Sequence, residues 1–318
     1  MVIATAPVAE KQKEKSRFAS ASSSLAVAAI LFFIGVAAVA YPVVSTLHNN
    51  AAASRVADEM SAEIEALDDD YKDDLLAEMR AYNDSLRSNP VVPGIPEKQD
   101  LQPTGEYERY LDVGRPHLLS TDTMSQIIIP DIGVRLPVYR GSGPMSLNRG
   151  AGHLFGTTLP VGGPGTNTAI TAHTGMATAT MFDNLINLKK GQDIFVTTLG
   201  ETMRYRMVDS VVVPPDTLDA IPPVGASDED RLFLITCTPY GLNFNRLIVE
   251  AHRIPLDAEP YPGDITDVTN SVGPWQTWMT VVAVIFAVFI LAMTWVLASA
   301  ARRRKSSSTP DSTISNKG

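Results

Sequence analysis

The single cysteine of the chain, Cys237, stands where a nucleophile is expected. It follows the apolar run 232–235, which is typical of a buried strand, and it precedes Pro239, which cannot continue a strand ladder. Cys237 is therefore predicted at a strand end, where a rigid scaffold meets an open surface. A thiol there is held in place and remains accessible to substrate. The alternative for a lone cysteine is an inert buried thiol, which is more typical of the middle of a strand.

Nine residues after the cysteine, Arg246 opens the apolar run 247–249. If the two strands pair antiparallel across the turn 238–245, Cys237 and Arg246 become neighbours at the same end of the hairpin. A guanidinium in that place favours the thiolate and stabilises a developing oxyanion. The alternative is an exposed arginine at a sheet edge that only supports solubility.

His173 supplies the third group, directly after the apolar run 168–170 and before a predicted turn. An imidazole has a pKa near 6.5, so it can accept a proton from a thiol and deliver one to a leaving amine. Together, Cys237, His173 and Arg246 indicate acyl transfer by a cysteine nucleophile. The other histidines are placed next to a membrane segment, in a loop, inside a strand or after a glycine: His48, His117, His252 and His153.

Two other kinds of site find no support in the sequence. The glycine-rich run 162–166 resembles a phosphate loop, but no Gly-Lys-Ser/Thr follows it, and its proline removes an N–H group. It is predicted to form a tight turn. No Cys/His cluster has zinc spacing, so we expect no metal and no other cofactor.

Charge is distributed unevenly along the 318 residues, whose formal net charge is −9. An acidic chain is a poor match for nucleic acid, which selects basic surfaces, so we expect no nucleic-acid partner. Two stretches of about 20 or more residues carry no charge and are long enough to cross a lipid bilayer: 25–44 and 275–301.

The basic clusters beside these stretches predict their orientation. Lysines and an arginine between 11 and 17 precede the first stretch, and residues 302–305 follow the second one. Positive flanks are typical of the cytoplasmic side, so the chain is predicted to cross the cell membrane twice, with its catalytic domain on the extracellular face. The alternative for the first stretch is a cleaved signal peptide, because 38–40 resembles a cleavage site.

The rest of the chain is divided by composition. Apolar residues recur every three or four positions between 51 and 86, which predicts one long helix or a helix pair. The predicted divisions are a cytoplasmic N-terminus 1–24, a membrane helix 25–44, a helical segment 45–88, a proline-rich lid or linker 89–123, a catalytic barrel 124–256, a linker 257–274, a membrane helix 275–301 and a basic cytoplasmic tail 302–318.

Short β-type runs separated by Gly and Pro predict a mainly β domain, closed as a barrel or a sandwich. One helix is predicted at Thr180–Leu188, ending before Gly191. The predicted strands are Ser125–Ile129, Val134–Tyr139, Gly152–Phe155, Thr168–His173, Asp193–Thr198, Met203–Val213, Arg231–Cys237 and Arg246–Ile254.

The segments around the three candidate residues resemble the active-site segments of the sortases. They are LITCTPY at 234–240, TAHTG at 171–175 and NFNRLIVEAHR at 243–253. The external domain from 127 to 254, followed by a second membrane helix, resembles the pilin-polymerising class C branch. Further segments that carry this resemblance are Leu136–Tyr139, His153–Gly156, 159–167, 178–185 and 236–241.

The resemblance implies an eight-stranded sortase-type β-barrel that cleaves a Leu-Pro-x-Thr-Gly-like (LPXTG-like) sorting signal between Thr and Gly. It implies Cys237 as nucleophile, His173 as general acid and base, and Arg246 as the residue that positions substrate and stabilises the oxyanion. Thr236 and Thr174 would support the substrate or the oxyanion. The implied partners are pilin or surface-protein substrates that carry the signal. A pilin lysine would release the thioacyl intermediate.

The sequence departs from the class C pattern in two places. No Asp-Pro-aromatic lid precedes the barrel, and the proline-rich stretch 89–104 occupies its place, with Val92 or Ile95 as candidate plugs. Asn245 stands where a histidine usually precedes the arginine. The alternatives are a sortase that anchors proteins to the cell wall, a non-catalytic membrane scaffold and a plain cysteine protease.

Overall fold

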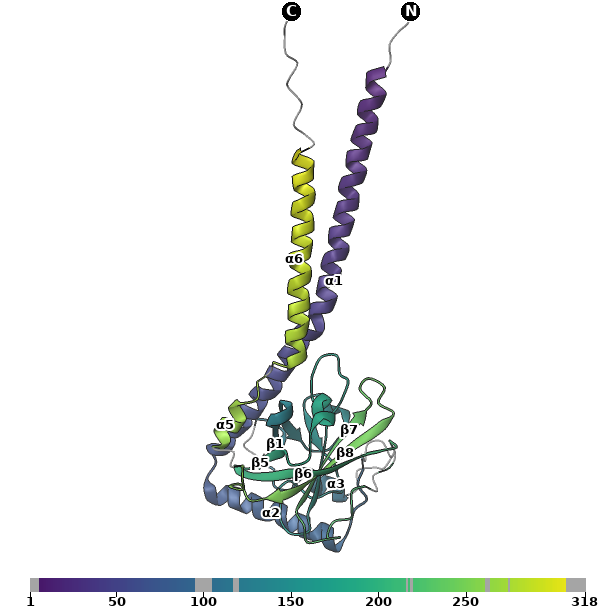
Figure 1. The fold of residues 1–318 in the computed structure, drawn as a ribbon. Coiled ribbons are helices and arrows are strands. Elements are labelled where there is room, and N and C mark those ends of the chain that lie inside the picture. The colour runs from purple at the N-terminus through teal and green to yellow at the C-terminus, as the bar shows by residue number, and fades with distance from the viewer. Residues whose placement is uncertain are drawn as a thin grey trace, which may run out of the picture. The chain divides into compact units, whose positions relative to one another are not determined.

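The computed structural model comprises two compact units, Met1–Pro274 and Trp275–Gly318. The residues that it describes are 6–94, 105–116, 120–215, 217, 220–260, 264–273 and 275–306. The second unit consists of the helix α6 (Thr277–Ser306). The first unit combines a long N-terminal helix with a β-barrel and shorter helices (Figure 1).

Two helices are long and apolar enough to cross a membrane, within the described part of the chain. They are α1 (Ala6–Glu65), in its part from Ile30 onward, and α6. Large apolar side chains such as Phe33 are mostly exposed on the first helix, and Trp295 is mostly exposed on the second. Apolar surface that no protein covers is the pattern of a helix that faces lipid.

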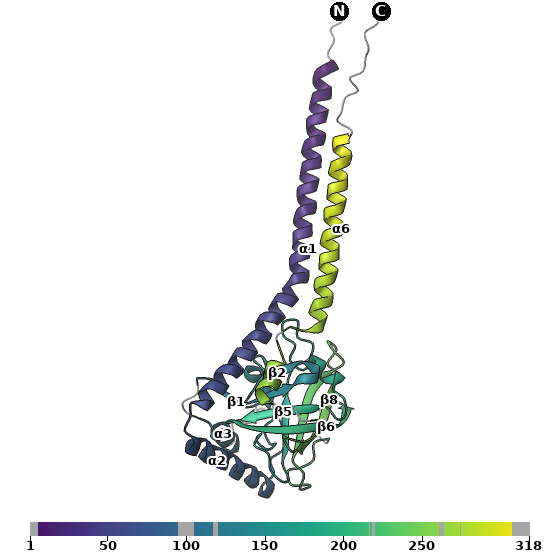
Figure 2. The same ribbon diagram turned by 60° about the vertical axis from the view of Figure 1, so that its left-hand side comes forward.

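After α1, the chain turns at Asp68 into α2 (Asp69–Ser88). The Asp68 side chain caps the new helix by accepting from the backbone N–H groups of Asp70 and Tyr71. The helix pair is thus one of the two arrangements predicted from the apolar spacing. The helix α3 (Gly105–Asp112) lies beside α2 (Figure 2), and buried residues such as Tyr82 and Tyr110 pack in one cluster between them.

Eight strands close into a barrel in the order β1-β2-β3-β4-β7-β8-β6-β5. Two neighbouring pairs are parallel, β2 with β3 and β4 with β7, and the others are antiparallel. The predicted barrel is confirmed. Both ends of each predicted strand lie within two residues of the ends of the corresponding observed strand. The strands are β1 (Thr123–Ile129), β2 (Val134–Tyr139), β3 (Ala151–His153), β4 (Asn167–Thr171), β5 (Asp193–Thr198), β6 (Glu201–Val213), β7 (Arg231–Thr238) and β8 (Asn245–Ile254).

Side chains alternate between the barrel interior and its outer face. On β7, Leu232 and Leu234 belong to the interior cluster, whereas Phe233 and Ile235 belong to a second cluster outside. On β8, Leu247 and Val249 point inward. Because successive side chains of a strand point to opposite faces, this alternation determines the face on which residues at the strand ends lie.

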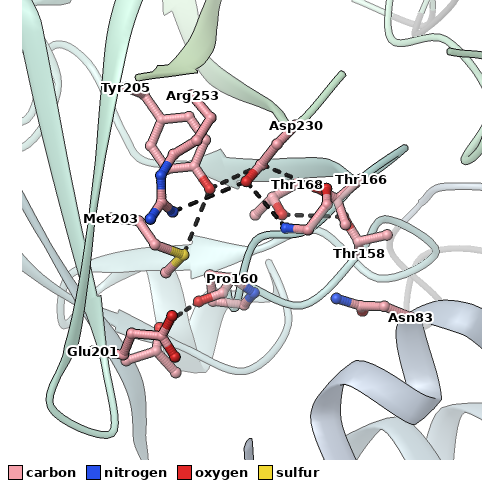
Figure 3. Close-up of polar contacts among 12 residues, drawn as sticks. Asn83, Thr158, Pro160, Thr166, Thr168, Glu201, Met203, Tyr205, Asp230 and Arg253 are labelled. Atoms are coloured by element: carbon pink, nitrogen blue, oxygen red, sulfur yellow. Dashed lines mark hydrogen bonds and ion pairs between the residues drawn. The ribbon is translucent and has the colours of Figure 1, made fainter. Parts of the chain in front are cut away.

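The glycine-rich run at 162–166 is a turn, as predicted. Gly162, Gly163 and Gly165 all have positive φ angles, which glycine adopts at low cost. The carboxylate of Asp230 accepts hydrogen bonds from the Gly163 N–H at 3.0 Å and the Thr166 hydroxyl at 2.9 Å (Figure 3). This network joins the starts of β4 and β7.

The helix predicted at Thr180–Leu188 is wrong in its extent. The structure has only a short 3-10 helix, η3 (Asp183–Asn187). Met181 has a φ angle of 42°, which an α-helix does not tolerate, and the Thr180 N–H is bonded to a side chain of α1. The other short elements are η2 (Pro130–Ile132), α4 (Pro144–Leu147) and α5 (Ile265–Asn270).

His153 is a fully buried structural residue. Its Nε2 atom lies 2.8 Å from the Thr158 carbonyl oxygen, which can only accept, so this nitrogen carries the proton. Its Nδ1 atom then accepts from the Tyr110 hydroxyl at 2.9 Å. Burial lowers the pKa of His153 to about 4, the Arg140 charge adds to this shift, and the bond to the Thr158 carbonyl oxygen opposes it.

We therefore expect the barrel to lose stability in mild acid through His153. The unfolded chain takes up a proton near pH 6.5, whereas the folded chain does so only near pH 4, so stability falls as pH drops through this window. From about pH 7.5 to about pH 5 the loss is about 2 kcal/mol. Urea unfolding of wild type and His153→Gln at both pH values tests this. The same pH dependence in both proteins would contradict it.

Candidate active site

Cys237 is the second-to-last residue of β7. It is half-buried and has a free thiol. Leu232 and Leu234 point into the barrel, so Cys237, an odd number of positions away, lies on the outer face. The predicted location at a strand end is confirmed. The thiol is held by a strand whose preceding residues are buried, and it is partly open to solvent.

Arg246 is directly opposite Cys237. The antiparallel register of β7 and β8 pairs these two residues, as the hairpin argument predicts. Ile248 lies in the outer cluster, so Arg246 shares the outer face with the cysteine. Its Nη1 atom donates to the carbonyl oxygens of Asn243 at 3.3 Å and Asn245 at 3.1 Å. These bonds tether the guanidinium to the turn between the two strands.

His173 follows the end of β4 and is half-buried. In the parallel pair of β4 and β7, Thr171 is opposite Ile235, and the Ala172 N–H donates to the Ile235 carbonyl oxygen at 3.1 Å. His173 and Cys237 each lie two residues beyond the Thr171–Ile235 pair, in the same chain direction. The topology therefore brings the histidine, the cysteine and the arginine to one end of three adjacent strands.

Thr174 and Thr236 lie beneath this constellation and are buried. Their hydroxyl oxygens are 2.5 Å apart. The Thr236 hydroxyl is 2.8 Å from the Ala172 carbonyl oxygen, and the Thr174 hydroxyl is 3.3 Å from that of Phe182. These contacts tie the segment after β4 to the end of β7. Support of substrate or oxyanion by the two threonines stays a prediction.

Asp183 is a residue near this site that the sequence analysis did not single out. Its Oδ1 atom accepts from the Gly175 N–H at 2.7 Å, two residues after His173. Burial raises the pKa of the Asp183 carboxyl to about 6, and the bond from Gly175 opposes this shift. Burial, and to a smaller degree the Asp183 charge, raise the pKa of Tyr240 in the turn after Cys237. No residue spacing in the sequence indicates this contact.

The described part of the proline-rich stretch lies away from Cys237. Gly94 forms an isolated bridge with Phe155, donating its N–H to that carbonyl oxygen at 3.1 Å. Together with Gly156 and Asn167, Val92 lines a cavity of about 230 Å³ at the start of β4, the end opposite His173. Val92 therefore does not plug the site. The other candidate plug, Ile95, lies outside the described residues.

The site offers a thiol, an imidazole and a guanidinium. Among the described residues, no three His, Cys, Asp or Glu side chains lie together as metal ligands would. A thiol opposite a guanidinium and beside an imidazole is suited to acyl transfer through a covalent intermediate.

Comparison with known proteins agrees with this arrangement. A family model described as the sortase domain matches residues 127–254. Sortase A from Corynebacterium diphtheriae has a solved structure that is 37% identical to this chain, with a TM-score of 0.57. The match covers 69% of this chain and 99% of that one. The chain belongs to the sortase family.

Other sortases of known structure are also similar to this chain. Sortase C-1 from Streptococcus pneumoniae is 40% identical with a TM-score of 0.55, covering 63% of this chain and 97% of that one. A pilus-related sortase C of Group B Streptococcus is 36% identical with a TM-score of 0.54, with the same two shares.

A curated relative is more distant. Sortase A of Streptococcus agalactiae serotype III (strain NEM316) is 27% identical over 158 residues. That match spans 46% of this sortase and 62% of the relative's length, which is less than two thirds.

Proposed function

We propose that this sortase is a membrane-anchored cysteine transpeptidase that cleaves an LPXTG-like sorting signal and joins it to an amine. The observation that supports this most is the common placement of Cys237, His173 and Arg246. The strand register and side-chain alternation assign all three to one outer face at the ends of β4, β7 and β8. A non-catalytic scaffold gives no reason for that coincidence.

In the first half of the proposed reaction, the Cys237 thiolate attacks the threonine carbonyl carbon of the signal. A bond forms between sulfur and this carbon, and the carbonyl oxygen takes the negative charge, which the Arg246 guanidinium stabilises. The carbon–nitrogen bond to glycine then breaks. His173 donates its proton to the departing amine, leaving a thioacyl enzyme.

In the second half, the acceptor amine attacks the thioacyl carbon. His173 accepts a proton from the amine, the new amide bond forms, and the Cys237 sulfur leaves. The protons and electrons balance without an added oxidant or reductant. The acceptor we propose is a pilin lysine, because sortase C structures from pilus-forming systems are among the similar ones.

The outer-face cluster next to Cys237 is suited to the apolar start of such a signal. Phe233, Ile235 and Ile248 belong to it together with Ile221 from the β6–β7 connection, which covers them so that all four are buried. We propose that the leucine and proline of the signal bind along this side of the sheet, between the strands and the connection.

We also propose that this sortase crosses the cell membrane twice, through 25–44 and 275–301. The catalytic barrel 124–256 then lies on the extracellular face, and the basic ends 1–24 and 302–318 lie in the cytoplasm. Two charge-free stretches, each almost entirely within a long apolar helix and each with a basic flank on the side away from the barrel in the sequence, support this orientation.

The proposal is tested with the full chain in detergent micelles, an LPXTG peptide and two alternative acceptors. We expect cleavage between Thr and Gly, and covalent ladders when a pilin with a reactive lysine is present. Single adducts with a cell-wall peptide alone would identify a wall-anchoring sortase instead. Hydrolysis that neither amine diverts would identify a protease, and intact peptide would overturn the proposal.

A further inference from the structure

The helix that leads out of the proposed membrane span contacts the segment that carries His173. This segment, residues 172–183, is called the histidine loop below. The Asn49 side-chain amide donates to the Thr178 carbonyl oxygen at 2.9 Å. The Asn50 amide donates to the Thr180 hydroxyl at 2.9 Å, and the Asn50 carbonyl oxygen accepts from the Thr180 N–H at 3.2 Å.

The next turn of α1 reinforces these contacts. Ala53 is buried and belongs to the same apolar cluster as Ala172, the first residue of the histidine loop, and Ala179 in its second half. An alanine allows the helix to approach the loop closely. Polar and apolar contacts from one helical face thus meet the segment that holds the proposed catalytic histidine.

The histidine loop has little regular structure to hold it in place. Inside the loop, the Phe182 N–H donates to the His173 carbonyl oxygen at 3.0 Å, and Asp183 binds the Gly175 N–H. Thr180 is 5% exposed, so its N–H depends on Asn50 in place of water. A buried N–H without a partner is costly, and a loop that loses one moves to recover a bond.

The helix α1 is attached to the barrel at other places as well. Asp58 forms an ion pair with Arg135 of β2, and Glu63 accepts from the Ser120 N–H at 3.2 Å. Met60 and Ile64 are buried farther along the helix. Loss of the asparagine contacts therefore leaves the helix docked and alters only its contact with the histidine loop.

We propose that Asn49 and Asn50 are positioning residues for acyl transfer, which hold the histidine loop so that His173 meets Cys237. This inference rests on the proposed function. Asn49 and Asn50 follow the charge-free stretch 25–44 within one continuous helix. The membrane-anchoring helix is thus part of the catalytic unit as well as a tether.

The test compares full-length Asn50→Ala, Asn50→Asp and wild type in detergent micelles. We expect kcat of Asn50→Ala on the LPXTG peptide to fall about 10-fold or more with KM nearly unchanged, because misplaced catalytic groups slow the chemical step. Asn50→Asp still accepts from the Thr180 N–H and is expected to recover part of this loss. Asp58→Asn removes the charge from an ion pair that the same helix makes away from the loop, so it serves as the matched control.

Wild-type kcat in Asn50→Ala, or an equal loss of kcat in Asp58→Asn, would overturn the inference. Alkylation of Cys237 by a small thiol reagent provides a readout that needs no substrate. The pH curve of labelling is expected to shift in Asn50→Ala and to stay in place in Asp58→Asn. If wild type shows no turnover, the proposed function fails, but the labelling curve still tests whether Asn50 positions His173 against Cys237. An unshifted labelling curve in Asn50→Ala contradicts that positioning.

Discussion

Cys237→Ala is expected to lower the rate of signal cleavage by about 10⁴-fold or more, because it removes the atom that forms the covalent intermediate. The side chain is half-buried at the end of β7, so the loss of one sulfur is expected to change the unfolding temperature little. The rate is measured with a fluorogenic LPXTG peptide and the full chain in micelles.

A matched control separates loss of the nucleophile from loss of the fold. Thr238→Ala changes the neighbouring residue at the same strand end and leaves the thiol in place. We expect it to retain cleavage within about 10-fold of wild type, since it removes no group assigned to the reaction. Cleavage by Cys237→Ala at the wild-type rate would exclude the cysteine as nucleophile.

His173→Gln is expected to reduce transfer by about 10²- to 10⁴-fold, the range for loss of a general acid and base. Glutamine keeps a polar side chain of similar size but cannot deliver a proton to the leaving amine. The loss is expected mainly in kcat, because the imidazole acts on the bonds that break and form. Steady-state kinetics with a peptide and a lysine acceptor measure this loss.

His252→Gln is the matched control for the histidine. His252 lies on β8 opposite Arg231, at the other end of the hairpin from Cys237, and its Nε2 atom is 3.0 Å from a Glu250 carboxylate oxygen. We expect near wild-type turnover from this variant. Equal losses in both variants would show that histidine replacement acts through the fold, and full activity of His173→Gln would remove His173 from the mechanism.

Local sequence signals predict the hairpin half of the site well. Cys237 and Arg246 are nine residues apart on two apolar runs with a proline-containing turn between them, so antiparallel pairing places them opposite each other. Short β-type runs separated by Gly and Pro also make the eight strands predictable, whereas the choice of a barrel over a sandwich came from the resemblance to the sortases. These features depend on neighbouring residues and on the two-residue period of a strand.

The position of His173 depends on a contact that local spacing does not reveal. It comes next to Cys237 through the parallel pairing of β4 with β7, across 64 residues of sequence. Its place after the apolar run 168–170 and before a turn selected His173 as a candidate, but nothing in its local sequence indicates that it meets Cys237. Long-range strand order is the information that the sequence pattern lacks.

The same reason explains where the predictions differ from the structure. The run 180–188 has a helical pattern, but a bond from Asn50, 130 residues earlier, holds Thr180 in a non-helical segment. The helix α3 falls in a stretch that was predicted to be a lid or linker. Its eight residues form a helix because Tyr107 and Tyr110 are buried against α2. Tertiary contacts outweigh local propensity in both cases.

The central claim is that the Cys237 sulfur forms a thioacyl bond with the threonine of a sorting signal. The most direct measurement incubates the full chain with an LPXTG peptide without an acceptor amine, and then determines the intact protein mass and the modified residue. The account predicts a mass increase equal to the peptide portion that ends in threonine, located on Cys237 and released when a lysine acceptor is added. Cleavage of the peptide with the adduct on another residue, or with no adduct at all, would contradict it.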